Sequence, residues 1–543
     1  MKETKRSRLV LVSLLLLLGL SAYLRLSGIA WGISSGYDHY LNFQPDEFIS
    51  IRGMLPIDLP AGKLRAPDGY FEGTFNYYLW AVPEMFRELW SGTRPIVGEN
   101  VPAGQLQFIL LSGRLMSVAF DIVTLIFLFA IIRELTDHPL SALLGALVYG
   151  VLPMQVIYSH FMRTYVLANL LCVLVIWLSL KALKHHHWLL FVITGLAAGL
   201  AAATRYPAGV ALGIPCFFVL LEGSGGHEPW LPRLGNRVRY LLSGPLWLLA
   251  GGFMVGFLAG EPMLLFDFRS VVHEISFEMS HYGPPGTRNP FDLMPVWRYI
   301  SVLIPYATYP LLWVLVYLST LYVILRPSLW PTVVPLCIFV AFYTYAMATG
   351  YMAMFARLVM LLLPVFCIFV GLTLGEILPK LAKRSLLFVL VLAIMFLLIA
   401  PSALFDWAYG QAMREHDVRE FLRRDMQELI KQSARTTIAV SEGGYYFYTA
   451  MPAVFPLASN NVAVQLETSL TGPPDFFVMG FAWPLTENER NGSIQKVESG
   501  GAFRFVNAYS HAPAIFGKTL DLSTFPPDMT YPFPEILLFR KAP

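Results

Sequence analysis

The chain has 543 residues, of which 56% are hydrophobic and 14% are charged, and its net charge at pH 7 is +3. An ordinary globular protein carries about 25% charged residues, so this composition indicates an integral membrane protein. Lysine and arginine are scattered along the chain and form no basic patch, and we therefore expect no nucleic-acid partner.

Long apolar runs predict the membrane spans, because one crossing needs about 20 apolar residues. The first run, 9–29, follows four basic residues but is longer than the core of a signal peptide, so we interpret it as a retained span. The later candidates are 106–132, 140–158, 165–183, 188–203, 207–221, 241–259, 302–325, 333–348, 358–378 and 386–400. We predict a mainly α, polytopic membrane protein with a bundle of about 11 transmembrane helices.

The distribution of basic residues predicts the orientation, because lysine and arginine near span ends favour the cytoplasmic side. The amino terminus and the short basic loops fall on one side, which is then cytoplasmic. The opposite, extracytoplasmic side receives the loops 31–103 and 261–298 and the tail 401–543. We expect a bacterial or archaeal plasma-membrane protein.

The tail differs in character from the transmembrane domain, 1–400. Residues 411–431 alternate charged and apolar side chains at helical spacing. Short β-like runs separated by Gly, Pro and Asn follow at 437–440, 462–466, 476–479, 503–506 and 536–539. We predict a small extracytoplasmic α/β domain over 401–543.

Two adjacent acids, Asp46 and Glu47, follow a proline in the stretch "HYLNFQPDEF" of the first outer loop. One interpretation is structural, because carboxylates directly after a proline suit the first turn of a helix. The other is functional, because the aromatic residues of "YFEGTFNYYLWAV", among them Tyr77 and Tyr78, suit a membrane interface and bring the loop close to the membrane surface.

Three arginines break the positive-inside pattern, since Arg163, Arg205 and Arg357 all lie at predicted outer ends of spans. One guanidinium group can bind two phosphate oxygens at once, so the three arginines together suit a lipid-linked phosphate. Snorkelling or helix capping is the structural alternative for each one alone. With the acid pair, they predict inverting glycosyl transfer, in which a carboxylate deprotonates an acceptor hydroxyl and the arginines stabilise the departing phosphate.

Several motifs resemble the GT-C membrane glycosyltransferases, close to the protein O-mannosyltransferase and aminoarabinose transferase group. The resemblance covers about 9–400 and is carried by "QPDEF", "FEGTFNYYLWA", "SGRLMSVAFDIVTLIFLFAIIREL", "VLPMQVIYSHFMRTYVLANLL", "GLAAGLAAATRYPAGVAL" and "ARLVMLLLPVF". It implies Asp46 as the catalytic base with Glu47 as its neighbour, and Arg163, Arg205 and Arg357 as donor phosphate ligands. It also implies a polyprenyl-phosphate sugar as donor.

Further residues are expected to line the substrate site: Tyr77, Tyr78, Tyr206, Glu274, Glu278 and His281. The last three share one face of a predicted helix in the second outer loop, where carboxylate and imidazole groups could also hold a divalent metal. Relatives often carry His where this chain has Gln44, so metal dependence stays open.

Two other classes compete with this hypothesis. A transporter or flippase of lipid-linked glycans usually shows inverted repeats and polar residues at the membrane midplane, and neither pattern is clear here. A polymerase or ligase that uses a lipid-diphosphate donor fits the arginines equally well. Neither the sugar nor the acceptor, whether protein, lipid or glycan, follows from the sequence.

Overall fold

The computed structural model describes residues 2–33, 43–65, 70, 72–92, 101–222, 244–282, 291–350, 354–431, 435–441, 449–470 and 472–543; the side chains of 2–7, 103 and 278–282 are not described. The chain divides into two compact units. The helical unit comprises Met1–Arg25, Ile49–Asn100 and Ser112–Ala403, and the C-terminal unit comprises Leu26–Phe48, Val101–Leu111 and Leu404–Pro543. Each unit is described by itself.

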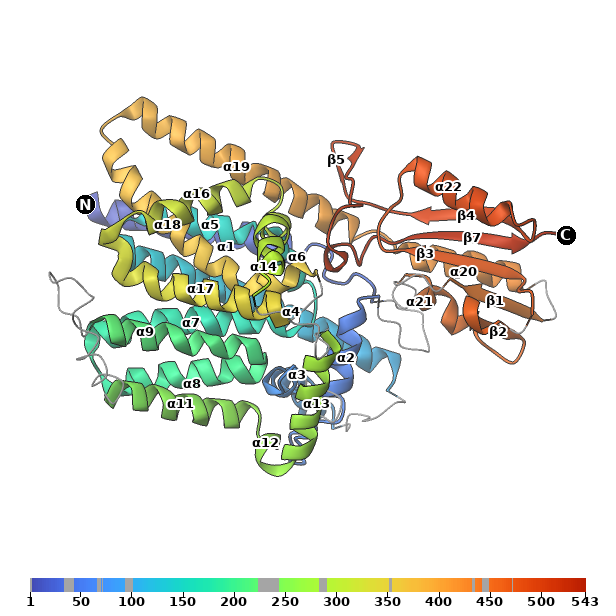
Figure 1. Ribbon diagram of the computed structural model, residues 1–543, viewed down its shortest axis with the longest axis horizontal. Helices are drawn as coiled ribbons and strands as arrows, with labels where there is room; N and C mark the ends of the chain where they lie inside the picture. The colour runs from blue at the N-terminus through green and yellow to red at the C-terminus, as the bar shows by residue number, and fades with distance from the viewer. Residues whose placement is uncertain are drawn as a thin grey trace. The chain divides into compact units, whose positions relative to one another are not determined.

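Helices dominate the first 412 residues of the chain (Figure 1). In chain order they are α1 (Lys2–Leu26), α2 (Pro45–Met54), α3 (Phe75–Ser91), α4 (Ala103–Thr136), α5 (Pro139–Gly150), α6 (Pro153–Ser159), α7 (Thr164–His185), α8 (Trp188–Thr204), η1 (Tyr206–Leu212), α9 (Gly213–Glu222), α11 (Gly244–Gly260), α12 (Met263–Phe266), α13 (Phe268–Tyr282), α14 (Met294–Arg298), η3 (Tyr299–Leu303), α15 (Ile304–Ala307), α16 (Leu312–Ile324), η4 (Pro327–Leu329), α17 (Trp330–Gly350), η5 (Ala356–Leu362), α18 (Leu363–Leu381) and α19 (Ser385–Ala412).

Six helices among the described residues are long and apolar enough to cross a membrane, and the pair α5 and α6, bent by 59°, makes a seventh if it is one span. Four shorter apolar helices accompany them: Trp188–Thr204, Tyr206–Leu221, Gly244–Gly260 and Leu312–Ile324. The predicted class, a mainly α polytopic membrane protein, is therefore confirmed.

The structure corrects two of the predicted spans, which contain breaks. The run 302–325 is divided into α15 and α16, with turns around Pro310 between them. The run 140–158 bends between α5 and α6, directly before Pro153. Proline lacks the backbone N–H that would continue a helix and disfavours helical geometry in the residue before it, which explains both interruptions.

Helices α8 and α11 pack side by side through a stripe of small residues. A Cβ atom on Gly195 would lie 2.1 Å from the carbonyl oxygen of Leu249, and one on Gly199 would lie 2.1 Å from that of Phe253. Only residues without a side chain allow backbones to approach so closely. Further along the two helices, Gly260 lies against Ala203, so α8 and α11 run in the same direction and their carboxyl ends lie together.

A buried ion pair joins the first, fourth and fifth helices. Arg25 Nε donates a 2.5 Å hydrogen bond to Asp121, and both side chains are fully buried. The Asp121 carboxylate also accepts a hydrogen bond from the Tyr149 hydroxyl, and Arg25 Nη1 donates to the Gly150 carbonyl over 2.7 Å. These bonds satisfy charges that would be costly in an apolar bundle.

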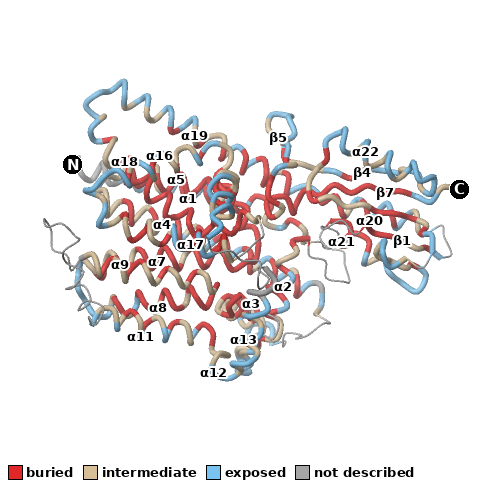
Figure 2. Tube along the Cα trace, viewed as in Figure 1, coloured by how far each residue is buried: buried red, intermediate tan, exposed pale blue. Residues whose placement is uncertain are grey.

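The spans Ala356–Leu381 and α19 differ in how much of each is buried inside the protein (Figure 2). In the span Ala356–Leu381, which includes α18, 94% of the most apolar window is buried inside the protein, whereas in α19 the figure is 17%. Exposed apolar residues such as Leu386 and Phe396 cover α19. A helix with so much exposed apolar surface suits contact with lipid.

The C-terminal unit contains an α/β domain with five strands in one sheet, in the order β2-β1-β3-β7-β4. Its elements are α20 (Val418–Ile430), β1 (Thr436–Val440), α21 (Met451–Val454), η6 (Phe455–Leu457), β2 (Val462–Leu466), η7 (Glu467–Ser469), β3 (Phe476–Phe481), α22 (Glu487–Glu498), β4 (Phe503–Ser510), β5 (Ala514–Ile515), β6 (Lys518–Thr519), η8 (Pro527–Met529) and β7 (Glu535–Lys541). Each of the five predicted β-like runs forms a strand of this sheet.

Side-chain alternation gives this sheet two apolar faces. Strand β1 pairs in parallel with β2 and β3, whereas β7 is antiparallel to β3 and β4. On one face, Ile438 belongs to the same buried cluster as Leu422 and Met426 of α20. On the other, Phe477 belongs to a cluster that includes Val497 of α22. The period-two pattern of the strands therefore produces a sheet covered on both sides.

Candidate active site

Two of the three arginines singled out by the sequence converge on one carboxylate, Glu72. Arg163 Nη2 donates a hydrogen bond to Glu72 Oε1, and Arg205 Nη1 lies 3.5 Å from the same oxygen. The exposed fractions of the three residues are 3% for Arg163, 7% for Arg205 and 7% for Glu72. Arg163 Nη1 also donates to the Ser50 hydroxyl of α2 over 3.0 Å. These contacts form a buried cluster of two arginines and one carboxylate in the helical unit.

The segment "EGTFN", which starts at Glu72, holds the carboxylate in place by capping two helices. The Thr74 hydroxyl donates to the Gly260 carbonyl at the end of α11 over 2.8 Å, and the Asn76 amide donates to the Thr204 carbonyl at the end of α8 over 3.2 Å. Gly73 has a φ of +102°, and a Cβ there would lie 2.4 Å from the Ala203 carbonyl oxygen. Helix ends leave carbonyls unpaired, so these side chains fix the loop to both.

A second buried carboxylate, Glu261, follows α11 directly. Its Oε2 accepts hydrogen bonds from the Thr74 amide at 2.9 Å and from the Tyr206 hydroxyl at 3.4 Å. Burial is the largest influence on this group and raises the pKa of the Glu261 carboxyl to about 7. Glu261 can therefore hold or release a proton near neutral pH.

Two tyrosines, Tyr158 and Tyr165, link Arg357 to Arg205. Arg357 Nη1 donates to the Tyr158 hydroxyl over 3.2 Å, and the Tyr158 ring packs edge-to-face on Tyr165 with centroids 5.3 Å apart. The Arg205 guanidinium lies 3.9 Å from the centre of the same Tyr165 ring. Stacking on rings lets guanidinium groups stay charged in a dry environment.

The tyrosines expected at the site lie in different surroundings. Tyr77 of α3 is fully buried, and its pKa is raised well above the ordinary value, first by burial and then by the charge of Glu72. The Tyr206 hydroxyl donates to the Tyr70 carbonyl as well as to Glu261. Tyr78 instead donates to the Leu64 carbonyl over 3.0 Å. Tyr77 and Tyr206 are thus grouped with the carboxylates Glu72 and Glu261.

Asp46 and Glu47 occupy the first turn of α2, as the structural interpretation of the sequence proposed. The Glu47 amide donates to the Gln44 side-chain oxygen over 2.6 Å, so Gln44 caps this helix. Glu47 is fully buried, whereas Asp46 is partly accessible. Both acids belong to the C-terminal unit.

The loop 261–298, predicted to be the second outer loop, contains α13, on which Glu274 is half-buried. The charge of Glu274 contributes to the raised pKa of Tyr77, together with those of Glu72 and Glu261. The side chains of Glu278 and His281 lie outside the described residues. Within the described part of the chain, no group of three or more His, Cys, Asp or Glu residues is arranged to hold a metal ion.

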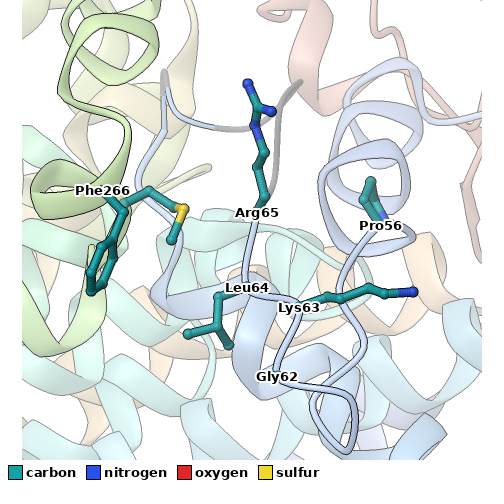
Figure 3. Close-up of a pocket in the computed structure, with 7 residues that line it drawn as sticks. Pro56, Gly62, Lys63, Leu64, Arg65 and Phe266 are labelled. Atoms are coloured by element: carbon teal, nitrogen blue, oxygen red, sulfur yellow. The ribbon is translucent and has the colours of Figure 1, made fainter.

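An open pocket of about 620 Å³ lies in the helical unit where the two predicted outer loops meet (Figure 3). It is lined by Pro56, Gly62, Lys63, Leu64, Arg65, Met263 and Phe266. The cations on its rim have acidic partners, since Arg65 pairs with Asp267 at 3.0 Å and Lys63 lies 3.9 Å from Asp58. Both loops therefore contribute to one accessible surface.

Sequence reasoning missed Glu72 and Glu261 as functional candidates. Glu72 lies inside the motif "FEGTFNYYLWA", and Glu261 follows an apolar run directly, so each had a local signal. A carboxylate at the edge of an apolar run costs free energy unless it is paired. An acidic residue at such a position therefore indicates a buried partner. What the sequence did not reveal is which basic residues they meet.

Three comparisons place these features among known proteins. Residues 106–244, which include Arg163 and Arg205, match the family model described as dolichyl-phosphate-mannose-protein mannosyltransferase. A search of curated proteins finds no match.

Solved structures similar to the chain include ArnT from Cupriavidus metallidurans bound to undecaprenyl phosphate, with 12% identity, a TM-score of 0.47 and 98% of each chain covered. The apo state of the same protein has 13% identity and a TM-score of 0.43, with 99% of this chain and 98% of that chain covered. The Archaeoglobus fulgidus oligosaccharyltransferase in complex with zinc and sulfate has 13% identity and a TM-score of 0.49, with 86% of this chain and 67% of that chain covered. The family match covers about a quarter of the chain, and over residues 106–244 the chain is similar to the mannosyltransferases of the matched family.

Proposed function

We propose that this protein is an inverting glycosyltransferase that moves a sugar from a polyprenyl-phosphate donor to an acceptor hydroxyl on the extracytoplasmic face of the membrane. The observation that carries the proposal is the buried pair Arg163 and Arg205, both directed at one carboxylate oxygen and both inside the segment that matches a lipid-phosphate-dependent mannosyltransferase family. Guanidinium groups held in this way suit a phosphate group.

In the proposed reaction, the acceptor oxygen attacks the anomeric carbon as the bond from that carbon to the phosphate oxygen breaks. The proton of the hydroxyl passes to Asp46, with Glu47 beside it, and the phosphate leaves with the bonding electron pair. Arg163, Arg205 and Arg357 stabilise the negative charge that develops on the leaving group. A single displacement of this kind inverts the anomeric configuration.

The remaining roles in this proposal follow from position. Tyr77 and Tyr206 lie close enough to Glu72 or Glu261 to line the sugar site, and Glu274 lies close enough to both tyrosines to affect them. Tyr78, Glu278 and His281 belong to the same two loops. The acceptor is a protein, lipid or glycan. A divalent metal at the second outer loop is compatible with the residue types there. The orientation, with the amino terminus in the cytoplasm of a bacterial or archaeal cell, rests on the positive-inside pattern.

Sugar transfer by the purified full-length protein tests this proposal. Polyprenyl-phosphate sugars and polyprenyl-diphosphate sugars are supplied separately, together with membrane extract as the source of acceptor, and transfer of radiolabelled sugar is measured. We expect transfer from the monophosphate donor. Transfer from the diphosphate donor alone would instead indicate a polymerase or ligase, and transfer from neither would favour a transporter.

Substitution of the acids tests the choice of base. Asp46→Asn should lower kcat by at least about a hundredfold, the usual contribution of a general base. Glu47→Gln should have a smaller effect on kcat. Asp58→Asn is the matched control, because Asp58 lies in the same loop and pairs with Lys63. An unaltered rate for Asp46→Asn, with a lost rate for Glu47→Gln, would transfer the role of base to Glu47.

A further inference from the structure

Glu72 occupies the position in which an anionic ligand of Arg163 and Arg205 would be expected. Its Oε1 meets both guanidinium groups, and the carboxylate is 93% buried, with an exposed fraction of 7%. The other oxygen, Oε2, is also buried and has no hydrogen-bond partner among the residues that the structure describes. Glu72 therefore acts on the same two cations that bind the donor phosphate in the proposed function.

The charge of this cluster has a chemical consequence. Among Arg163, Arg205 and Glu72 alone, two guanidinium groups and one carboxylate sum to a charge of +1. A lipid phosphodiester, in which phosphate joins a polyprenol to a sugar, carries one negative charge. After transfer, the polyprenyl phosphate is a monoester, and it carries nearly two negative charges above its second pKa of about 6.

We propose that Glu72 is a specificity-determining residue that matches the arginine pair to a singly charged phosphodiester and disfavours the doubly charged phosphomonoester. The inference rests on the proposed function. Glu72 repels the second charge of the product, so the donor binds in preference to the spent carrier. The product then leaves after transfer instead of blocking the site. Glu72 acts through the arginines and takes no part in proton transfer.

Equilibrium binding of two lipids, each of which contains a single phosphate group, tests this role. The first is polyprenyl methyl phosphate, an unreactive diester, and the second is polyprenyl phosphate. Both are measured at pH 8 with the full-length protein in lipid nanodiscs. In the wild type, the diester should bind more tightly. In Glu72→Gln, the ratio of the two Kd values should shift toward the monoester by about tenfold or more, because a charge within about 4–6 Å has effects of this size.

Two further variants separate charge from structure. The double variant Glu72→Gln with Arg163→Gln restores the original net charge and should return the Kd ratio toward that of the wild type. Glu84→Gln is the control, because Glu84 is a buried carboxylate of α3 that pairs with Arg87. This control should leave the ratio unchanged.

The outcomes distinguish failure of the role inferred for Glu72 from failure of the proposed transferase function. If the wild type transfers sugar but Glu72→Gln keeps the wild-type Kd ratio, the specificity role is overturned and the transferase remains. If the wild type neither binds these lipids nor transfers sugar, both proposals fail. Should Glu72→Gln not fold, Glu72→Ala carries the test, because it also removes the negative charge and must shift the ratio toward the monoester; no shift overturns the inference.

Discussion

The backbone amide of Thr74 donates a 2.9 Å hydrogen bond to Glu261, although 187 residues separate them in the chain. The bond joins the segment before α3 to the end of α11, and the Thr74 hydroxyl caps the same helix. Glu72 lies two residues earlier and meets Arg205 at the end of α8. The position of the arginine cluster therefore depends on the packing of α8 against α11.

The raised pKa of Glu261 predicts a pH-dependent stability. An ordinary glutamate has a pKa of about 4.3, whereas burial raises that of Glu261 to about 7. Between these values the native state binds more protons than the unfolded state, so stability falls as pH rises, by up to about 3 kcal/mol. Glu261→Gln mimics the neutral acid, and its apparent Tm should exceed that of the wild type at pH 8.5 and equal it at pH 4.5.

The exposed Glu487 of α22 provides the control for this measurement, and Glu487→Gln should follow the wild-type profile. If Glu261→Gln and the wild type differ by the same amount at every pH, the titration of Glu261 does not contribute to stability.

The glycine stripe between α8 and α11 predicts a sharp sensitivity to one added methyl group. Gly199→Ala would place its Cβ 2.1 Å from the Phe253 carbonyl oxygen, so the helices must separate. We expect a loss of about 1–3 kcal/mol, the usual cost of overpacking. In contrast, Gly251→Ala adds its Cβ where no atom lies within 4 Å. Apparent Tm values in detergent compare the two, and equal values would contradict tight packing at Gly199.

The buried Arg25–Asp121 pair predicts that removing one partner lowers the stability of the protein more than removing both. Asp121→Ala leaves Arg25 buried without its carboxylate and should cost about 3–5 kcal/mol. The double variant Arg25→Met with Asp121→Leu removes both charges and should recover most of the lost stability. Glu428→Ala in α20, which breaks the exposed pair with Lys431, should change nothing measurable. A double variant less stable than Asp121→Ala would refute this account.

The contact between Arg357 and Tyr158 predicts a change in donor binding. Arg357→Lys keeps the charge but loses the planar group that reaches the Tyr158 hydroxyl, so KM for a polyprenyl-phosphate sugar should rise about tenfold, equivalent to 1.4 kcal/mol. Tyr158→Phe removes only the hydroxyl and should have a smaller effect. Arg326→Lys, on the Tyr322 ring, is the matched control. Equal KM values in Arg357→Lys and Arg326→Lys would exclude Arg357 from the donor site.

Local patterns in the sequence determined most of the elements and the class of the protein. Apolar runs predicted the membrane helices, and alternation predicted the strands that begin at Thr436 and Phe476, because burial of one face imposes a fixed period. The exceptional positions of Arg163 and Arg205 were visible as well, since charge is rare near apolar spans. Breaks at Pro153 and Pro310 were within reach of the same reasoning.

Only the tertiary structure decided which charges meet. Glu72 is separated from Arg163 by 91 residues and from Arg205 by 133, and no local period relates them. Their meeting requires α8 and α11 to run in the same direction with their ends together, which depends on backbone contacts at four glycines, Gly195, Gly199, Gly252 and Gly256. Helical periodicity reports which face of a helix is buried but not which partner buries it. For that reason the sequence predicted arginines that bind an anion, and the fold supplied Glu72.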